Sequence, residues 1–390
     1  MEFNQHSCTG RVRGMRWLVA LAVLVFALIV AAGGLLASNY KHFGTLFKVI
    51  SLVRTQYLEP VSTTTLVDGA IRGLVKSLND PYSVYLDAGE YAQLREQIQG
   101  AFGGLGILVG IKDGYLTVER SYQGTPAQRS GIMKGDMITR IDDRDARGID
   151  LDTAIGLMRG PVGTKVKLTI ARKGVARPWD VELVREEISV PTVEGRMLPG
   201  ESGIGYIALS QFTEKTPGEL EATIARLKSQ GMRGVLLDLR NNPGGELHAA
   251  VKVAGYFVPQ GPVVYIDYRS GKQETYSADG QNLKLPLVVL VNRASASAAE
   301  ILAGAIKDTG SGVLVGERTF GKGIVQTVFD LDNGAGLKLT TARYLTPSRH
   351  DIHKKGITPD VVVEQEPNAA VDEQMEKALQ ILESKMAKAA

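Results

Sequence analysis

The sequence predicts a multidomain protein of mixed α and β structure (α+β / α/β) whose second half is a layered α/β domain. The chain has 390 residues, which is room for two or three domains of ordinary size. Its 44 glycines and 15 prolines indicate many turns. In the second half, short apolar runs typical of strands alternate with longer segments of helical periodicity, which is the pattern of a layered α/β domain.

The first 40 residues contain a candidate membrane anchor. Residues 18–37 are almost wholly apolar and lie in an uncharged stretch, long enough for a helix to cross a hydrocarbon core of about 30 Å. Arg11, Arg13 and Arg16 precede this stretch, so the positive-inside rule places the N-terminus in the cytoplasm and the body of the chain outside it. A cleaved signal peptide is the alternative, but its apolar region is normally shorter. We therefore expect residues 1–40 to form a cytoplasmic N-terminus and an uncleaved anchor.

Residues 41–98 are expected to form a helical segment. Residues 43–57 and 66–78 place their apolar side chains at helical spacing. Pro81 ends the second helix, because proline disfavours the helical conformation of the residue before it. A third helix is predicted over residues 88–99. We interpret these helices as packing elements rather than as a binding groove.

Residues 99–187 form the second predicted domain, which opens with a glycine-rich run and an apolar strand. Backbone N–H groups in such a loop can point towards one ligand and bind a peptide carboxylate beside an exposed sheet edge. A hairpin glycine is the commoner explanation of such a run, and a dinucleotide loop is disfavoured because no strand-turn-helix unit surrounds it. A helix over residues 150–158 and strands over 165–172 and 179–184 are predicted to follow. The candidate peptide-binding residues are Gly104, Leu105, Gly106 and Ile107.

Residues 188–366 form the third predicted domain, in which strands and helices alternate. Strands are predicted over residues 204–209, 235–239 and 287–291, and helices over residues 217–230, 246–257 and 298–309. Residues 367–390 contain a predicted amphipathic C-terminal helix over residues 371–388.

The composition excludes several classes of function. The formal net charge of +3 is close to neutral and argues against a nucleic-acid partner. Cys8 is the only cysteine, so neither an intrachain disulfide nor a cysteine zinc cluster can form. The chain has five histidines and no Gly-x-Ser-x-Gly turn, which argues against a Ser-His-Asp hydrolase. We expect no metal and no other cofactor.

Ser297 and Lys322 are the candidate catalytic pair. Ser297 stands at the start of the predicted helix 298–309, where exposed N–H groups favour a developing oxyanion and the Ala298 N–H is the natural first donor. A lysine can act as the base for a serine if burial or neighbouring charges lower its pKa. The alternatives are that Ser297 only caps the helix and that Lys322 is a solvated turn residue. A phosphate-binding loop is rejected, because Gly323 stands where a hydroxyl residue should hold magnesium.

The run Asp-Leu-Arg-Asn-Asn-Pro-Gly-Gly at residues 238–245 has the chemistry of a tight turn between a strand and a helix. An N–H group of Gly244 or Gly245 is the candidate second donor to the oxyanion. A purely structural turn is the alternative. We interpret Asp238 and Arg240 as residues that brace the turn.

Three motifs together resemble the active site of the carboxy-terminal processing peptidases, or tail-specific proteases, a serine-protease family built around a PDZ domain. They are residues 238–245, the run around Ser297, and Gly321-Lys322-Gly323 with Gln326. The resemblance covers nearly everything after about residue 45, and Ala299 stands where many relatives have another serine. It implies a PDZ domain over residues 99–187, a protease domain over residues 188–366 and a Ser-Lys dyad.

The resemblance also implies roles outside the dyad. Relatives carry a glutamine at the position of Gln326 that positions the lysine amine, and an even spacing within a strand would put Lys322 and Gln326 on the same face. Arg159 resembles an arginine that in some relatives couples peptide binding to assembly of the protease site; its alternative is a cation favoured by a helix C-terminus. In relatives the N-terminal helices serve oligomer contacts, so a homo-oligomer or a regulatory partner is a candidate.

From these arguments we expect a bacterial serine endopeptidase, anchored in the cytoplasmic membrane by a single helix, with its catalytic body on the extracytoplasmic side. It would bind the apolar C-terminal tail of a protein through the PDZ domain and cleave by way of an acyl-enzyme. The main alternative is a catalytically inactive PDZ scaffold that only binds protein C-termini. An α/β esterase is the third hypothesis.

Overall fold

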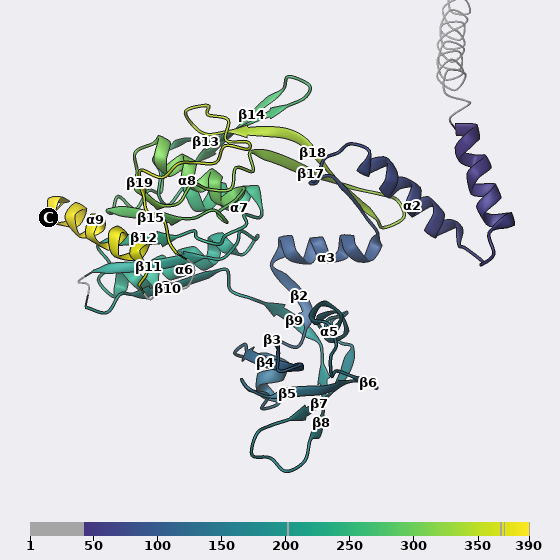
Figure 1. Cartoon of the computed structure of the whole chain (residues 1–390). Helices are drawn as coiled ribbons and strands as arrows, with labels where there is room; N and C mark the ends of the chain where they lie inside the picture. The colour runs from purple at the N-terminus through teal and green to yellow at the C-terminus, as the bar shows by residue number, and fades with distance from the viewer. Residues whose placement is uncertain (1–42, 201–202, 367–368, 370, 390) are drawn as a thin grey trace, which may run out of the picture. The chain divides into compact units, whose positions relative to one another are not determined.

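The computed structural model describes residues 43–200, 203–366, 369 and 371–389 (Figure 1). The chain forms two compact units, of which the first ends at Leu78 and the second begins at Asn79. The described part of the first unit is a helix over residues 43–56 and a second helix, α2 (Thr63–Lys76). Both predicted helices are confirmed. The second begins before its apolar pattern does, because the Ser62 hydroxyl caps it by accepting the Thr65 N–H at 3.0 Å.

No helix within the described ranges is long and apolar enough to cross a bilayer. The anchor predicted over residues 18–37 lies outside the described residues. The first unit leaves large apolar side chains at its surface, among them Phe47 at 69% exposure and Leu58 at 93%.

The second unit begins with a short strand, β1 (Val84–Leu86), and a helix, α3 (Ala88–Gln99). The helix has the predicted bounds and ends at Gly100, whose φ of 72° is in the left-handed region that glycine tolerates. Strand β1 was not predicted, because three residues are too few to show an alternating pattern. It pairs antiparallel with β18 (Gly336–Leu345), far along the chain.

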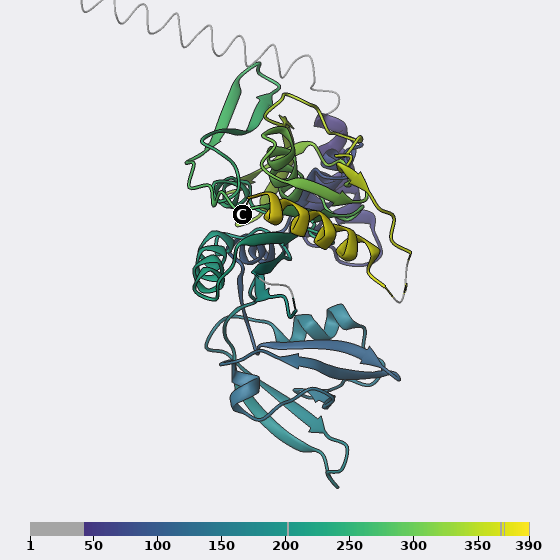
Figure 2. The ribbon, with the colours of Figure 1, turned by 90° about the vertical axis from the view of Figure 1, so that its left-hand side faces the viewer.

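The PDZ-like region is an antiparallel sheet with its own core (Figures 1 and 2). Strands β2 (Ala101–Gly104) and β9 (Glu186–Ser189) pair with each other where the chain enters and leaves this region. Leu116, Ile138 and Leu168 are fully buried in the core. The sheet consists of β3 (Ile107–Lys112), β4 (Tyr115–Ser121), β5 (Met137–Ile141), β6 (Arg144–Asp145), β7 (Lys165–Ala171) and β8 (Trp179–Val184), with helices α4 (Pro126–Arg129) and α5 (Leu151–Met158). The predicted helix and both predicted strands are confirmed.

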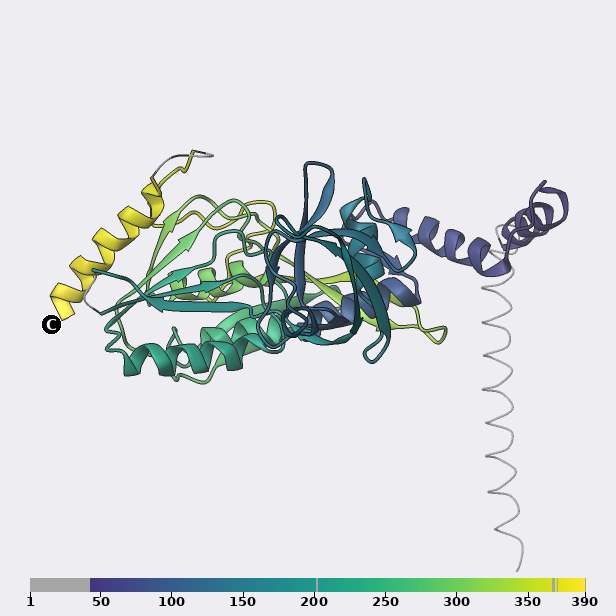
Figure 3. The same ribbon diagram turned by 90° about the horizontal axis from the view of Figure 1, so that it is seen from below.

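The α/β region is built on a six-stranded sheet in the order β10-β11-β12-β15-β16-β19, parallel except for β10. Helices α6, α7 and α8 cover one face, and α9 covers the other (Figure 3). This arrangement explains why the central strands are apolar on both faces. The strands are β10 (Val193–Met197), β11 (Ile204–Leu209), β12 (Gly234–Asp238), β15 (Leu287–Val291), β16 (Val313–Gly316) and β19 (Val361–Val362); the helices are α6 (Thr216–Ser229), α7 (Leu247–Ala254), α8 (Ala298–Asp308) and α9 (Glu373–Ala389). The predicted elements are confirmed to within a few residues.

A second sheet of this region was not predicted. Its order is β1-β18-β13-β14, and β17 also pairs with β18. Val264, Ile266 and Tyr344 from this sheet are buried in the same core as helices α7 and α8. The additional strands are β13 (Gly261–Tyr268), β14 (Gln273–Ala278) and β17 (Ile324–Asp330).

Candidate active site

Ser297 stands between β15 and α8, as predicted, in a strained backbone conformation. Its φ of 55° and ψ of −115° lie outside the regions that non-glycine residues favour. The loop before it is fixed by the buried Ser295, whose hydroxyl donates to the Leu239 carbonyl at 2.8 Å. The Ser297 carbonyl in turn accepts the Tyr344 hydroxyl at 3.1 Å. The surrounding core therefore holds Ser297 rigidly at the carboxyl end of the parallel strands.

Glu300 is a buried carboxylate that joins the serine segment to the lysine loop. Its Oε2 accepts the Ser297 N–H at 2.9 Å and the Lys322 N–H at 2.8 Å. Its Oε1 accepts the Gly321 N–H at 2.7 Å and the Thr319 hydroxyl at 2.5 Å. A fully buried carboxylate is stable only when its lone pairs are used in this way. Glu300 was not predicted as a site residue; its only signal in the sequence is its place three residues after Ser297, where a helix-capping glutamate often stands.

The Lys322 amine is partly buried and lies over the Tyr82 ring, 4.9 Å from the ring centroid. Burial, followed by the nearby Lys338 ammonium, lowers the pKa of Lys322, while the carboxylates of Asp80 and Glu300 act in the opposite direction. Within the described residues, the amine makes no hydrogen bond to Ser297 and no ion pair. The lowered pKa of Lys322 favours the neutral amine, which is the form that can act as a base. In this arrangement the amine lies on the face of the Tyr82 ring.

Gln326 lies in β17, but not in the geometry that its spacing from Lys322 suggested. Lys322 precedes the strand, and the ladder with β18 shifts between Val325 and Gln326. The even spacing therefore does not define a common face, because a bulge interrupts the alternation. The Gln326 Nε2 atom is buried without a hydrogen-bond partner in the described part of the chain, as is Oγ1 of its cross-strand neighbour Thr340.

The turn at residues 238–245 lies directly against Ser297. A Cβ atom added to Gly244 would be 2.7 Å from Ser297 Cβ and 2.9 Å from the Ala298 nitrogen, so only glycine fits. The Gly244 N–H already donates to Asn242 Oδ1 at 2.9 Å. Among the described residues, the N–H groups of Gly245 and Ala298 have no such acceptor. Of the two candidate glycines, Gly244 is therefore the one whose N–H is already used within the turn.

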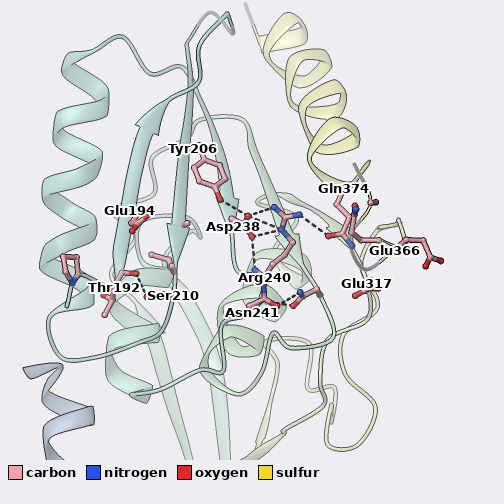
Figure 4. Close-up of a pocket in the computed structure, with 16 residues that line it drawn as sticks. Thr192, Glu194, Tyr206, Ser210, Asp238, Arg240, Asn241, Glu317, Glu366 and Gln374 are labelled. Atoms are coloured by element: carbon pink, nitrogen blue, oxygen red, sulfur yellow. Dashed lines mark hydrogen bonds and ion pairs between the residues drawn. The ribbon is translucent and has the colours of Figure 1, made fainter. Parts of the chain in front are cut away.

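Asp238 and Arg240 brace the turn, as expected, and Arg240 also reaches the C-terminal helix. The Arg240 guanidinium donates to Asp238 Oδ2 at 2.8 Å (Figure 4). It also donates to both oxygens of Asp372, the residue before α9, at 2.9 Å. Burial and the neighbouring Asp238 carboxylate raise the pKa of Tyr206, which donates to Asp238, to about 12. Tyr206, Asp238 and Arg240 line a polar cavity of about 780 Å³ at the carboxyl ends of the parallel strands.

The predicted peptide-binding residues line a smaller, largely apolar cavity of about 170 Å³ in the PDZ-like region. Gly106 has a φ of 75°, and a Cβ atom added there would be 2.2 Å from Thr125 Cβ, so glycine is required. Arg159, at the end of α5, also lines this cavity, with its guanidinium carbon 4.0 Å from the Phe102 ring centroid. The remaining predicted residues, Gly104, Leu105 and Ile107, are in the same lining.

Comparison with known families agrees with this architecture. The model of peptidase family S41 matches residues 203–363, the PDZ domain model matches residues 94–171, and the model of the N-terminal domain of the activating protease CtpB matches residues 31–90. The carboxy-terminal-processing protease of Bartonella bacilliformis is 40% identical over 367 residues, covering 91% of this chain and 83% of that protein. The chain belongs to the carboxy-terminal processing proteases of family S41. It is therefore a serine-type peptidase with a PDZ domain.

Other members of the family support the assignment. The carboxyl-terminal-processing protease of Synechocystis is 40% identical over 344 residues, covering 85% of this chain and 80% of that protein. Among solved structures, the photosystem II D1 C-terminal processing protease is 33% identical with a TM-score of 0.51, covering 87% of this chain and 92% of that chain. A putative S41 protease from Bacteroides fragilis is 17% identical with a TM-score of 0.52, covering 86% of this chain and 97% of that chain, and shares the fold.

Proposed function

We propose that this processing protease is an endopeptidase that uses Ser297 as nucleophile and Lys322 as general base, assisted by Gln326. The observation that carries the proposal is the Glu300 carboxylate, which accepts from the backbone N–H groups of both dyad residues. A shared buried anchor fixes the two segments relative to each other, and this is the preorganisation that a nucleophile and its base need. Burial of the Lys322 amine supports the role of base.

The proposed cycle needs only groups of this chain and water. The neutral Lys322 amine takes the proton of Ser297 Oγ as Oγ attacks the scissile carbonyl carbon. The oxyanion that forms accepts hydrogen bonds from the N–H groups of Ala298 and Gly245. The lysine ammonium then protonates the leaving amine as the C–N bond breaks, which leaves an acyl ester on Ser297. A water molecule, deprotonated by the same amine, releases the acid and restores the enzyme.

The PDZ cavity supports the second part of the proposal, which is recognition of an apolar C-terminal tail. Leu105, Ile107 and Met158 give this cavity an apolar wall beside the edge strand β3. A peptide that adds to this edge would gain backbone hydrogen bonds from the strand and apolar contacts from the wall. Arg159 lines the same cavity, and we propose that it couples the binding of a tail there to assembly of the protease site.

Cleavage of an unstructured protein with an apolar C-terminal tail tests the dyad, using the full chain in detergent. Wild type should cleave, while Ser297→Ala and Lys322→Ala should lose cleavage by about 1,000-fold or more and still bind the tail. Cleavage retained by Lys322→Ala would exclude the dyad. Tail binding without wild-type cleavage would favour the PDZ scaffold or an enzyme that requires an activator.

We also propose that residues 18–37 anchor the enzyme in the cytoplasmic membrane with the body outside the cytoplasm. The uncharged apolar stretch and the three preceding arginines support this orientation. The protein should resist alkaline extraction from membranes, and external protease should digest its body in intact spheroplasts. Release of the full-length chain by alkali would contradict the anchor.

A further inference from the structure

Residues 79–86 form part of the protease region although they precede the PDZ domain in sequence. Asp80 organises a turn by accepting the Tyr82 N–H at 3.0 Å and the Ser83 hydroxyl at 2.6 Å. Ser83 in turn accepts the Thr340 N–H of β18 at 3.0 Å, and β1 pairs with the same strand. The backbone of Tyr82 is therefore fixed from both sides, which restricts where its ring can lie.

The Lys322 amine lies over the Tyr82 ring, 4.9 Å from the ring centroid. An ammonium within about 6 Å of an aromatic centroid is attracted by the negative face of the ring. Three charged groups also face the amine from the elements packed around it. The Lys338 ammonium on β18 repels it, and the carboxylates of Asp80 in the turn and Glu300 on α8 attract it.

We propose that Tyr82 is a positioning residue for the lysine base, which holds the Lys322 amine in the site and stabilises the ammonium that forms each time the lysine takes a proton. This proposal rests on the Ser297–Lys322 dyad. In the dyad mechanism positive charge develops on the amine as Ser297 attacks, and a preformed aromatic face stabilises that charge without solvent reorganisation. The turn at residues 79–83 is thus part of the catalytic apparatus rather than only the end of a helix.

The test is the pH dependence of kcat/KM for Tyr82→Leu, which keeps an apolar side chain beside the amine and removes the π face. Only the neutral amine is a base, so kcat/KM rises with pH up to the pKa of Lys322 and then levels off. Without the ring the ammonium is less stable, so the acidic limb should move to lower pH by roughly half a unit or more. The plateau should fall several-fold, because the developing charge loses its partner.

Two controls separate this effect from a loss of structure. Tyr82→Phe keeps the ring and should keep the acidic limb in place. Tyr265→Leu removes a similar pair, in which the Arg349 guanidinium carbon lies 4.1 Å from the Tyr265 ring centroid, and should also leave the limb unchanged. If Tyr82→Leu does not fold, a fluorinated phenylalanine at position 82 keeps the shape of the ring and weakens its negative face.

Each outcome bears on one proposal. A shifted limb in Tyr82→Leu, or in the fluorinated protein, with both controls unshifted supports the role of Tyr82. An unshifted limb overturns it, even if activity falls, because a purely structural role would lower the amount of active enzyme and not the pKa of its base. If the Lys322→Ala variant still cleaves the substrate, the dyad itself is refuted. If Lys322→Ala loses all cleavage and the acidic limb of Tyr82→Leu does not shift, only the role of Tyr82 is refuted.

Discussion

A single carboxylate, that of Glu300, receives four hydrogen bonds in a place that water does not reach. Burying a charge without partners costs far more than a protein of this size can tolerate, and here the backbone supplies the partners. Ser297 and Lys322 are therefore held by a residue that takes no part in the proposed proton transfers. Their spacing is maintained as long as the carboxylate keeps these four hydrogen bonds.

We expect Glu300→Gln to lower kcat/KM by about 10- to 100-fold. The amide NH₂ group would replace one carboxylate oxygen, and it cannot accept the two hydrogen bonds that this oxygen accepts. Steady-state kinetics on a tail-bearing substrate measures the loss. Glu219→Gln is the matched control, since the Glu219 carboxylate accepts the Thr192 N–H at 2.7 Å in the same region. The control should lose stability only. Equal losses of kcat/KM in both variants would mean that Glu300 has no special link to the dyad.

The sequence identifies Ser297 and Lys322 because their motifs are local. Neither Tyr82 nor Glu300 has a local signal of that kind. The proposed role of Tyr82 depends on the fold, which brings the turn at residues 79–83 close to Lys322. In the sequence, Glu300 is only one polar position on an apolar helix. A pattern in one segment cannot show which partner another segment will bring.

The turn that connects β12 and α7 depends on Asn242, which is fully buried. Its Nδ2 donates to the Leu209 carbonyl at 2.8 Å and its Oδ1 accepts the Gly244 N–H. The Asn242 carbonyl accepts the Ala296 N–H at 2.9 Å, which ties the turn to the serine loop. The sequence predicts a turn here from its Asn, Pro and Gly content, but not which asparagine carries the hydrogen bonds.

Asn242→Ala should lower the free energy of unfolding by about 2–4 kcal/mol, because it leaves a buried carbonyl and a buried N–H without partners. Urea unfolding followed by far-ultraviolet circular dichroism measures the change, because Trp179 lies in the PDZ domain and fluorescence would report mainly on that domain. Asn282→Ala is the control, since Asn282 accepts the Lys284 N–H in an exposed turn and should cost much less. If both variants lose the same free energy, the turn does not depend on the buried asparagine.

Elements with a clear cap or a continuous apolar run were predicted well, as with the helix α3 and the strand β15. The sheet of β13, β14, β17 and β18 was not predicted, because its strands are only half-buried and are interrupted by register shifts. Such strands show neither a continuous apolar run nor a clean alternation. The strands around Lys322 were therefore the hardest part of the fold to predict from the sequence.

At the scale of the whole molecule, the PDZ domain and the protease domain have separate hydrophobic cores. Leu168, Ile138 and Leu116 belong to the first core, and Leu237 and Val289 to the second. A domain with its own core can unfold by itself. The stability of one domain is therefore expected to change without a matching change in the other.

Leu168→Ala should destabilise the PDZ domain by about 2–5 kcal/mol and lower only one of two unfolding transitions. Differential scanning calorimetry resolves the transitions, and a tail peptide that binds the PDZ domain identifies which one belongs to it. Leu237→Ala should lower the other transition. A single transition that moves in both variants would show that the domains unfold together.

The pairing of Val84 in β1 with Lys338 in β18 determines the order in which the newly made protein matures. Synthesis proceeds from the N-terminus, so β1 emerges early and must wait unpaired while the whole PDZ domain and most of the protease domain are made. The PDZ domain is continuous in the chain and can fold during that wait. The ability to bind tails is therefore acquired before the ability to cut.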